Sequence, residues 1–390
     1  MNSKTLSKND FSLINRSLIS LKNHIELKNY KGFDPYDCLK SPVFNLPIFN
    51  SNKYIRFLSQ QFLKRFPLNL RKILLIKEGL NPVTLGLSLQ SYSYLFKIDI
   101  NNKNLYLSRI DKLIQKLEEL IPVGFSGACW GYDFDWEARY MKIPAYQPSL
   151  VATGIISNAL FTTHLITKNE KACKMLLSST NFLKKDINRS YENEKICFSY
   201  SPFDYEKVFN ASMKGVRLLS QDYFLTGNPN SKMLAKKAIE YVMSYQNGNG
   251  SWEYGLAKKG NWIDSYHSGY VLDCLKSYQK LTKDYRFQDN LDLGFKFFRN
   301  SFVTSEGIPK FYNNQTYPVD CTSAAQIITT LVHFGDTQNA FKIAKWMILN
   351  MQKEDGSFMF RIFEHYKINT SYMRWSNAWM FKALSMLRSQ

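Results

Sequence analysis

Six segments of this 390-residue sequence share one pattern, a polar or aromatic lead-in followed by a helix of small and apolar residues. Successive segments start 66, 60, 56, 56 and 52 residues apart. A recurrence of this kind indicates repeated supersecondary units. The segments begin at residues 82, 148, 208, 264, 320 and 372.

A second set of helices alternates with the first and carries one lysine-rich face. Its members span 52–66, 106–120, 171–185, 231–246, 287–302 and 339–352. A helix that is apolar on all sides is buried on all sides, whereas a helix with one charged face lies at the surface. Six such pairs predict an all-α fold, the (α/α)6 toroid, in which an outer ring encloses an inner ring. An open solenoid is the alternative, but it needs polar caps at both ends, and we find none.

No linker rich in proline, glycine or serine divides the chain. We therefore expect residues 1–50 to form an N-terminal extension packed on the toroid, and 51–390 to form a single toroid domain. Short strand-like pieces, such as 196–203 and 308–319, fit β-hairpins at one rim of the toroid.

The composition is strongly basic, with a net charge of +19. Such a charge attracts nucleic acid, an anionic membrane surface or an acidic polysaccharide. The lysines are scattered and form no run of five or six. The alternative to an anionic partner is therefore a basic surface that is simply exposed to solvent. No nucleic-acid recognition motif is present, and we expect no nucleic-acid partner.

Motifs for metals, cofactors and export are absent from the sequence. The six cysteines show neither CxxC pairs nor zinc-finger spacing, which indicates a reducing compartment and no structural metal. The N-terminus lacks the apolar core of a signal peptide, and no apolar run is long enough to span a membrane. P-loop, Rossmann, HExxH and nucleophile-elbow motifs do not occur. We expect a cytoplasmic protein with no transmembrane segment, no metal and no cofactor.

In such a toroid every inner helix begins at the same mouth. Unpaired N–H groups and helix dipoles there favour anionic ligands. The crossings before these helices are rich in aromatic and polar residues, which suit the faces and hydroxyls of sugar rings, although they can also clamp rim hairpins together. The predicted substrate-binding residues are Trp130, Tyr132, Trp136, Trp252, Tyr254, Trp262, Tyr266, Tyr372, Trp375 and Asn377.

His267 is the main candidate for acid–base chemistry. It follows Asp264 at a spacing of three, so one helical turn would let the carboxylate hold the imidazole as a general base or acid. A capping or core histidine is the alternative. Glycoside hydrolysis needs a pair of carboxylates, and its stereochemistry depends on a separation that sequence cannot supply. The candidates for this pair are Asp133, Asp135, Glu253, Asp264 and Asp320. Arg374 can pair with a substrate carboxylate through its guanidinium fork.

Five motifs, taken in order, resemble a bacterial family of polysaccharide biosynthesis proteins found with exopolysaccharide gene clusters and related to six-hairpin glycosidases. The resemblance spans nearly the whole chain and implies an (α/α)6 fold and a role in surface-glycan production, but no settled reaction. The motifs are GFDPYDCLKSPVF (32–44), GACWGYDFDW (127–136), DSYHSGYVLDCL (264–275), YPVDCTSAAQ (317–326) and MRWSNAWMFKAL (373–384).

A second resemblance is to terpenoid cyclases, which also use α/α toroids. QNGNGSW (246–252) and QKEDGSF (352–358) are similar to their Gln–Gly–Trp repeat, and DCTSA (320–324) is similar to their protonating-aspartate motif. This resemblance would make Asp320 a general acid. The chain has about half the length of those two-barrel enzymes and shows no obvious membrane-docking apolar patch, so we interpret the repeats as structural turns.

Together these features predict a carbohydrate-active enzyme that acts on an acidic, uronate-containing polysaccharide or oligosaccharide during its biosynthesis. Epimerase, lyase and hydrolase remain open as reactions. The alternatives are a terpenoid-cyclase-like or prenyl-handling enzyme and a non-catalytic glycan-binding scaffold in a complex of biosynthetic proteins.

Overall fold

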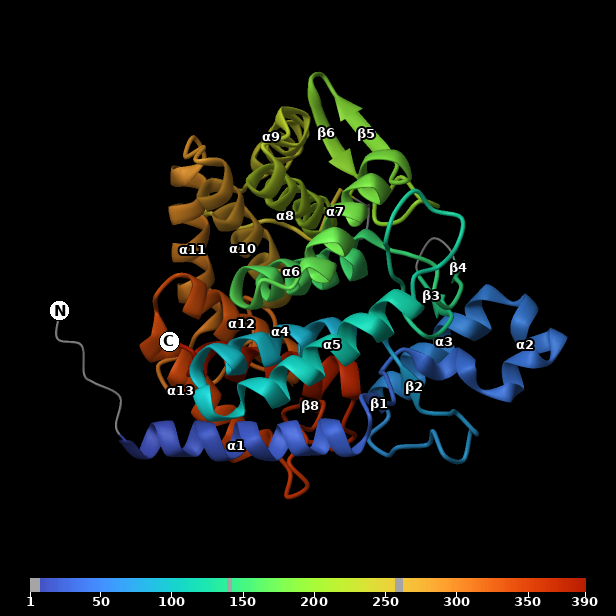
Figure 1. The fold of residues 1–390 in the computed structure, drawn as a ribbon. Coiled ribbons are helices and arrows are strands. Elements are labelled where there is room, and N and C mark those ends of the chain that lie inside the picture. The colour runs from blue at the N-terminus through green and yellow to red at the C-terminus, as the bar shows by residue number, and fades with distance from the viewer. Residues whose placement is uncertain (1–7, 139–141, 257–261) are drawn as a thin grey trace.

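A computed structural model describes residues 8–138, 142–256 and 262–390. Six mostly buried helices form a closed inner ring in it. Each inner helix contacts the next along the chain, and the last contacts the first (Figure 1). The predicted (α/α)6 toroid is confirmed. The inner helices are α4 (Pro82–Ile98), α6 (Leu150–Thr167), α8 (Phe209–Thr226), α10 (Ser265–Thr282), α12 (Cys321–His333) and α14 (Trp379–Arg388), the last preceded by the π-helical turn η4 (Met373–Ala378).

Short polar residues start several of these inner helices. Asn81, Ser149, Asp264 and Asp320 each accept a hydrogen bond from a backbone N–H in the first turn of the helix that follows. This capping satisfies donors that would otherwise have no partner at the helix start. It also places these four side chains at the same end of the ring.

Five of the six outer helices match the lysine-faced segments. They are α5 (Lys103–Glu119), α7 (Glu170–Lys185), α9 (Pro229–Met243), α11 (Gln288–Phe302) and α13 (Thr337–Met351). Each contacts the inner helix that precedes it in the chain. Their charged faces lie at the surface, as the pattern predicts.

The sixth outer helix is not the one that the pattern suggested. We expected the 52–66 segment in this place, but α1 (Lys8–Leu27) takes it and contacts α13 and α14. The segment forms α3 (Lys53–Arg65) after the short α2 (Pro47–Ser51), and α3 contacts the 3₁₀ turn η1 (Asp37–Lys40) and a rim strand. The reason is burial: α1 buries a stripe of four aliphatic residues, whereas α3 buries Gln60 and Leu63. The stripe consists of Ile14, Leu18, Leu21 and Ile25.

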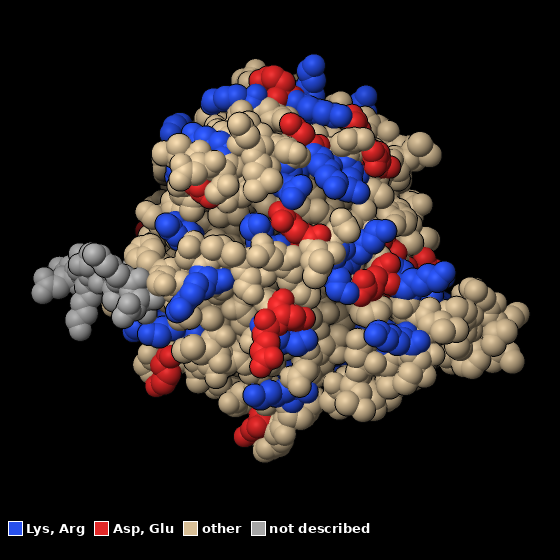
Figure 2. All heavy atoms as spheres, turned by 60° about the horizontal axis from the view of Figure 1, so that its bottom comes forward, with Lys and Arg blue, Asp and Glu red and all other residues tan. Residues whose placement is uncertain are grey.

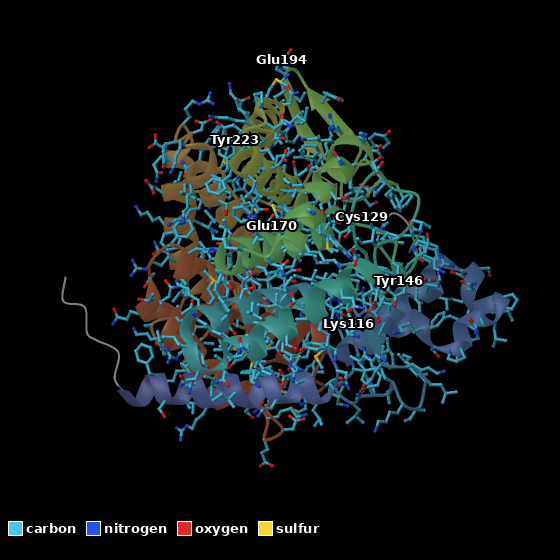
Figure 3. The ribbon with its side chains drawn as sticks, viewed as in Figure 1. Lys116, Cys129, Tyr146, Glu170, Glu194 and Tyr223 are labelled. Carbon is cyan, nitrogen blue, oxygen red and sulfur yellow. The ribbon has the colours of Figure 1, made fainter. Side chains whose placement is uncertain are left out.

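Short antiparallel strands lie in the segments that connect the helices. β1 (Lys31–Gly32) pairs with β2 (Gly79–Leu80), β3 (Trp136–Glu137) with β4 (Lys142–Ile143), and β5 (Arg189–Glu192) with β6 (Lys195–Phe198). A three-stranded sheet contains β7 (Val319–Asp320), β8 (Arg361–Ile362) and β9 (Lys367–Ile368). Its register sets Asp320 opposite Arg361. Figure 3 shows Glu194 at the outer tip of the β5–β6 hairpin and Cys129 in the interior. The remaining turns are η2 (Pro42–Asn45) and η3 (Ile100–Asn102).

One helix, α6, is long and apolar enough to cross a bilayer by composition alone, but 67% of it is buried inside the protein. It contacts α4, α7 and α8 within the two rings. Its apolar character therefore follows from its place in the inner ring.

A buried ion pair ties the segment after α1 to the start of the last inner helix. The guanidinium of Arg374 donates from Nε and Nη2 to the two carboxylate oxygens of Asp34, at 2.6 and 2.8 Å. Both residues are only 4% exposed. The neighbouring Arg71 donates to Asp37 and to the backbone oxygen of Asp34. A two-pronged pair of this kind fixes the segment after α1 against η4 with a defined geometry.

Polar side chains also lie inside the ring, between the inner helices. The ammonium of Lys382 donates to Thr329 at 3.1 Å, and Asp273 accepts from Gln326 and pairs with His333. Burial lowers the pKa of Lys382 to about 7, against the opposing attraction of Asp273. The centre of this core is therefore polar and sensitive to pH.

We predict that Asp34→Ala lowers the free energy of unfolding by about 3–5 kcal/mol, because it leaves the buried Arg374 charge without its partner. Chemical denaturation followed by circular dichroism measures the change. Glu194→Ala is the matched control, because it breaks the exposed Lys237–Glu194 pair, which water screens, and should change stability little. Equal losses in the two variants would contradict the prediction.

We predict that Lys382→Met stabilises the fold most below pH 7, by at most about 5 kcal/mol. Below that pH the ammonium is charged in both the folded and the unfolded state, so folding buries a charge. Between pH 7 and about 10 only the unfolded state keeps the extra proton, so wild-type stability rises with pH and the advantage of methionine shrinks. Urea unfolding at pH 6 and 9.5 checks this, with the exposed Lys112→Met as control. A gain that does not depend on pH would contradict it.

Candidate active site

A cavity of about 740 Å³ opens where the inner helices begin. The starts of α8, α10 and the η4 turn contribute to it, as do β3, β8 and helix α3, which lies outside the ring. Aromatic side chains make up much of its wall. They are Tyr36, Phe57, Tyr132, Phe134, Trp136, Tyr200, Tyr254, Trp262, Tyr266, Phe311, Tyr312 and Trp375.

His267 and Asp264 form a hydrogen-bonded pair on this wall. One carboxylate oxygen of Asp264 caps helix α10 by accepting from the backbone N–H of His267 at 2.8 Å. The other accepts from Trp262 Nε1 at 2.8 Å and lies 2.7 Å from His267 Nδ1. A carboxylate can only accept, so Nδ1 carries the proton of the neutral ring and Nε2 keeps a lone pair. The arrangement leaves Nε2 as the basic nitrogen of a residue that lines the cavity.

Two tyrosine rings contact the imidazole of His267 edge-on. The ring centroid of Tyr254 lies 4.7 Å from that of His267, and the centroid of Tyr266 lies at 4.5 Å. Tyr254 also stacks on Trp262 at 4.5 Å, which joins the Asp264–His267 pair to an aromatic platform. Flat aromatic faces beside a fixed base are suited to a sugar ring, whose C–H bonds can lie against them.

Arg374 reaches the cavity, but its fork is already occupied by Asp34. Its guanidinium carbon lies 4.7 Å from the Tyr132 ring centroid. The structure therefore places Arg374 as a fixed positive charge beside the aromatic wall, and its Nε and Nη2 are not free for the two-pronged grip on a ligand that we expected.

Asp320 lies beneath the wall and does not line the cavity. It caps α12 through Ser323, pairs with Arg361 at 2.5 Å and accepts from Trp375 Nε1. Its side chain is fully buried under these donors. The carboxylate positions Arg361 and Trp375, which do line the cavity, and is not placed to protonate a ligand there.

Lys64 is a cavity residue that sequence reasoning missed. It reaches the cavity from α3, donates to the hydroxyl of Tyr36 and lies 4.1 Å from that ring centroid. Burial and the nearby charge of Arg361 hold its pKa well below the ordinary value. The sequence carried no signal for this placement, because the segment looked like an ordinary outer helix.

An acidic turn before α8 is a second missed feature. Asp204 accepts from the backbone N–H groups of Tyr200 and Glu206 and from the hydroxyl of Ser201. Both Asp204 and Glu206 line the cavity. Burial, with the charge of Asp204, raises the pKa of Glu206. Glu206 is therefore the lining carboxyl that is best suited to hold a proton.

Several predicted site residues lie elsewhere. Trp130 and Trp252 are buried, and their indole N–H groups donate to the backbone oxygens of Leu117 and Val242 near the ends of outer helices. The Trp252 contact matches the structural role that we gave to the Gln–Gly–Trp repeats. Asp133 is held by Lys40 and Asn81, and Tyr372 lies under the guanidinium of Arg71.

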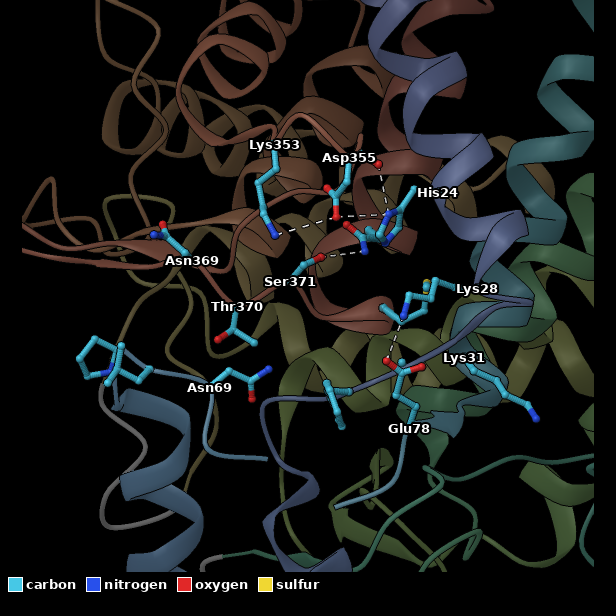
Figure 4. A pocket seen from close by; sticks show the side chains of 16 residues that line it. His24, Lys28, Lys31, Asn69, Glu78, Lys353, Asp355, Asn369, Thr370 and Ser371 are labelled. Atoms are coloured by element: carbon cyan, nitrogen blue, oxygen red, sulfur yellow. Dashed lines mark hydrogen bonds and ion pairs between the residues drawn. The ribbon is translucent and has the colours of Figure 1, made fainter. Parts of the chain in front are cut away.

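Asn377 lines a different, smaller cavity of about 430 Å³ beside the end of α1. Its amide accepts from the backbone N–H of Phe358 and donates to Ser371. Figure 4 shows this cavity, with the ion pair between Lys28 and Glu78 on one side and His24 near Asp355 on another. The main cavity thus collects Tyr132, Trp136, Tyr254, Trp262, Asp264, Tyr266, His267, Arg374 and Trp375 from the predicted set.

No protein-family model matches the chain, and no curated protein does. Solved structures are similar in fold. A family 76 glycoside hydrolase (mannosidase) from Bacteroides thetaiotaomicron aligns over 98% of both chains with 10% identity and a TM-score of 0.65. Cellobiose 2-epimerase from Bacillus thermoamylovorans aligns over 79% of this chain and 87% of its own, with 10% identity and a TM-score of 0.61. A possible member of glycoside hydrolase family 105 from Salmonella enterica aligns over 100% and 96%, with 11% identity and a TM-score of 0.62. The fold is therefore that of the six-hairpin-glycosidase-like enzymes.

We predict that Asp264→Asn moves the proton of His267 from Nδ1 to Nε2, because an amide N–H would then face Nδ1. Nitrogen-15 NMR of the imidazole, at a pH where the ring is neutral, distinguishes the two tautomers. Asp320→Asn, which alters another helix cap, should leave the His267 signals in place. A wild-type ring already protonated on Nε2 would contradict the prediction.

Proposed function

We propose that this toroid, of the six-hairpin-glycosidase kind, is a carbohydrate-active enzyme that moves a proton on a sugar of an acidic glycan, with His267 as the base. The observation that carries the proposal is the Asp264–His267 pair, which leaves Nε2 basic beside a stacked aromatic platform. A histidine that a carboxylate orients through one ring nitrogen can accept a proton on the other, which is the role of a general base.

The distribution of carboxylates favours epimerase or lyase chemistry over hydrolysis. Hydrolysis commonly needs two carboxyl groups that flank the bond. Of the carboxylates that line the cavity in the described residues, Glu137 pairs with Arg56 at 2.6 Å, and Asp204 and Asp264 accept several hydrogen bonds each. Glu206 remains as a proton donor. One available carboxyl does not supply the pair that flanks a bond, whereas removal of a proton needs only the histidine base.

Cationic side chains around the cavity support an acidic substrate. Arg65 and Lys207 line it, together with the fixed charges of Arg361 and Arg374. In a uronate the carbon next to the carboxylate carries the C5 proton. His267 would remove that proton while the cations stabilise the charge that develops on the carboxylate. Return of a proton on the opposite face gives epimerisation, and loss of the C4 oxygen substituent gives elimination.

The setting that we propose is the cytoplasmic side of surface-glycan biosynthesis. Its support is the order of the five motifs in the sequence and the free state of the six cysteines, five of which are buried. The buried position of Asp320 and the charged cavity favour a glycan over the terpenoid alternative. A non-catalytic glycan-binding scaffold would not need a histidine whose imidazole is oriented by a carboxylate, as His267 is by Asp264.

Hydrolysis is the second candidate, and Glu206 is the reason to keep it. Burial and the charge of Asp204 raise the pKa of Glu206, which is the direction required of the acid that protonates the leaving oxygen in glycoside cleavage. Glu206→Gln separates the two reactions: it should abolish cleavage, whereas proton removal by His267 should survive it.

Proton NMR of the protein with acidic and neutral polysaccharides in D2O tests the proposal. Loss of the H5 signal shows epimerisation, new vinyl protons show a lyase, and new reducing-end protons show a hydrolase. We predict that His267→Ala slows the reaction by about 10²–10⁴-fold. His365→Ala, at an exposed position outside the cavity, should leave the rate unchanged. Full activity of His267→Ala, or glycan binding without turnover by the wild type, would overturn the assignment.

A further inference from the structure

Residues 38–77 form a lobe beside the cavity mouth, which we call the 38–77 lobe. The β1–β2 pair closes its base, with Lys31 opposite Leu80 and Gly32 opposite Gly79. The lobe has a small hydrophobic core of its own around Cys38, Leu63 and Ile76, separate from the core of the rings. Figure 1 shows α2 and α3 projecting beyond the rings at one edge of the molecule. Much of the lobe therefore has no protein against it.

Large apolar side chains are exposed on the lobe. Tyr54, Leu58 and Phe62 of α3 follow one another at spacings of four, which places them on one face of the helix, and they are 75%, 63% and 57% exposed. At the same edge of Figure 2 the molecule protrudes with few charged side chains at its tip. The lobe makes up about a tenth of the chain yet exposes nine large apolar side chains. They are Val43, Leu46, Ile48, Tyr54, Leu58, Phe62, Leu68, Ile73 and Leu75.

The charge of the lobe has one sign. It contains eight lysine and arginine residues and no aspartate or glutamate. Four of the cations are exposed, namely Lys53, Arg65, Lys72 and Lys77. The other four are held by contacts that orient the lobe, such as the Arg56–Glu137 and Arg71–Asp37 ion pairs. An apolar surface flanked by cations complements a partner surface that has an anionic outer layer over an apolar interior.

We propose that the 38–77 lobe docks on an anionic membrane surface, with the stripe of Tyr54, Leu58 and Phe62 at the boundary between headgroups and acyl chains. A short amphipathic helix with exposed apolar residues and flanking lysine and arginine is suited to lie in that plane. A second copy of this chain is the weaker occupant, because two such lobes would set cation against cation. In the sequence we found no obvious membrane-docking patch, because the 52–66 pattern predicted an outer helix whose apolar face is buried against the ring; in the structure Tyr54, Leu58 and Phe62 of α3 are exposed.

Helix α3 also forms part of the cavity wall. Phe57, Gln61 and Lys64 line the cavity, and so does Leu58 of the exposed stripe, so the stripe reaches the edge of the cavity. A docked lobe sets the cavity mouth next to the bilayer, within reach of a glycan attached to lipid. This consequence rests on the proposed function, whereas the docking itself does not.

Flotation with lipid vesicles tests the docking without any substrate. The full chain is mixed with phosphatidylcholine vesicles that either lack or contain phosphatidylglycerol, and the floated fraction is measured. We expect binding to the anionic vesicles at low salt, weaker binding at high salt and little binding to the neutral vesicles. The variant Ile48→Asp/Tyr54→Asp changes two side chains that are each 75% exposed, so the fold is preserved. It should weaken binding by about tenfold or more, because two apolar anchors become anionic.

The matched control is Ile100→Asp/Val123→Asp, which changes exposed apolar residues outside the lobe. It adds the same charge and should bind vesicles like the wild type. Equal losses in the two double variants would show a general charge effect and overturn the proposal. So would a wild type that stays unbound, or a dimer in light scattering that Ile48→Asp/Tyr54→Asp dissociates. If docking holds while no glycan reacts, the proposed function fails and the membrane surface stands.

Discussion

Burial of six helices that are apolar on nearly every side is the constraint on which the rest of this structure depends. Such helices cannot face water, so each needs neighbours on all sides. A closed ring gives every inner helix two inner neighbours, and the outer helices shield the ring from solvent. Closure requires that the last inner helix meet the first, as α14 and α4 do, and the Asp34–Arg374 pair ties the segment after α1 to the start of that last inner helix.

The same closure creates the site. Because every inner helix runs in one direction, their capped starts meet at one mouth, and the crossings that lead into them bring aromatic side chains together there. Asp264 shows how one residue meets both demands. One of its oxygens caps α10, and the other orients His267. The cap that starts the helix is thus also the group that prepares the proposed base.

Helix α3 shows where pattern reasoning reached its limit. Its spacing of apolar and basic residues is that of an outer helix, and by periodicity it is as good a candidate as α1. Competition for one place in the ring decided between them, and α1 has the longer aliphatic stripe. Because α3 does not lie in the ring, it forms part of the cavity wall and contributes Lys64 to it. Its large apolar side chains Tyr54, Leu58 and Phe62 stay exposed.

The sequence by itself determined the number of helix pairs, the division into buried and charged helices, the toroid and the Asp264–His267 pair, because these depend on periodicity or on residues within one turn. Only the tertiary structure decided which partners the remaining side chains found. The guanidinium of Arg374 pairs with Asp34, which is 340 residues away in the chain. Asp320 pairs with Arg361 because the register of β7 and β8 sets the two residues opposite each other. Trp130 and Trp252 turned into the core. Such pairings join distant segments, and local spacing carries no information about which of several buried partners a charge or an indole will meet.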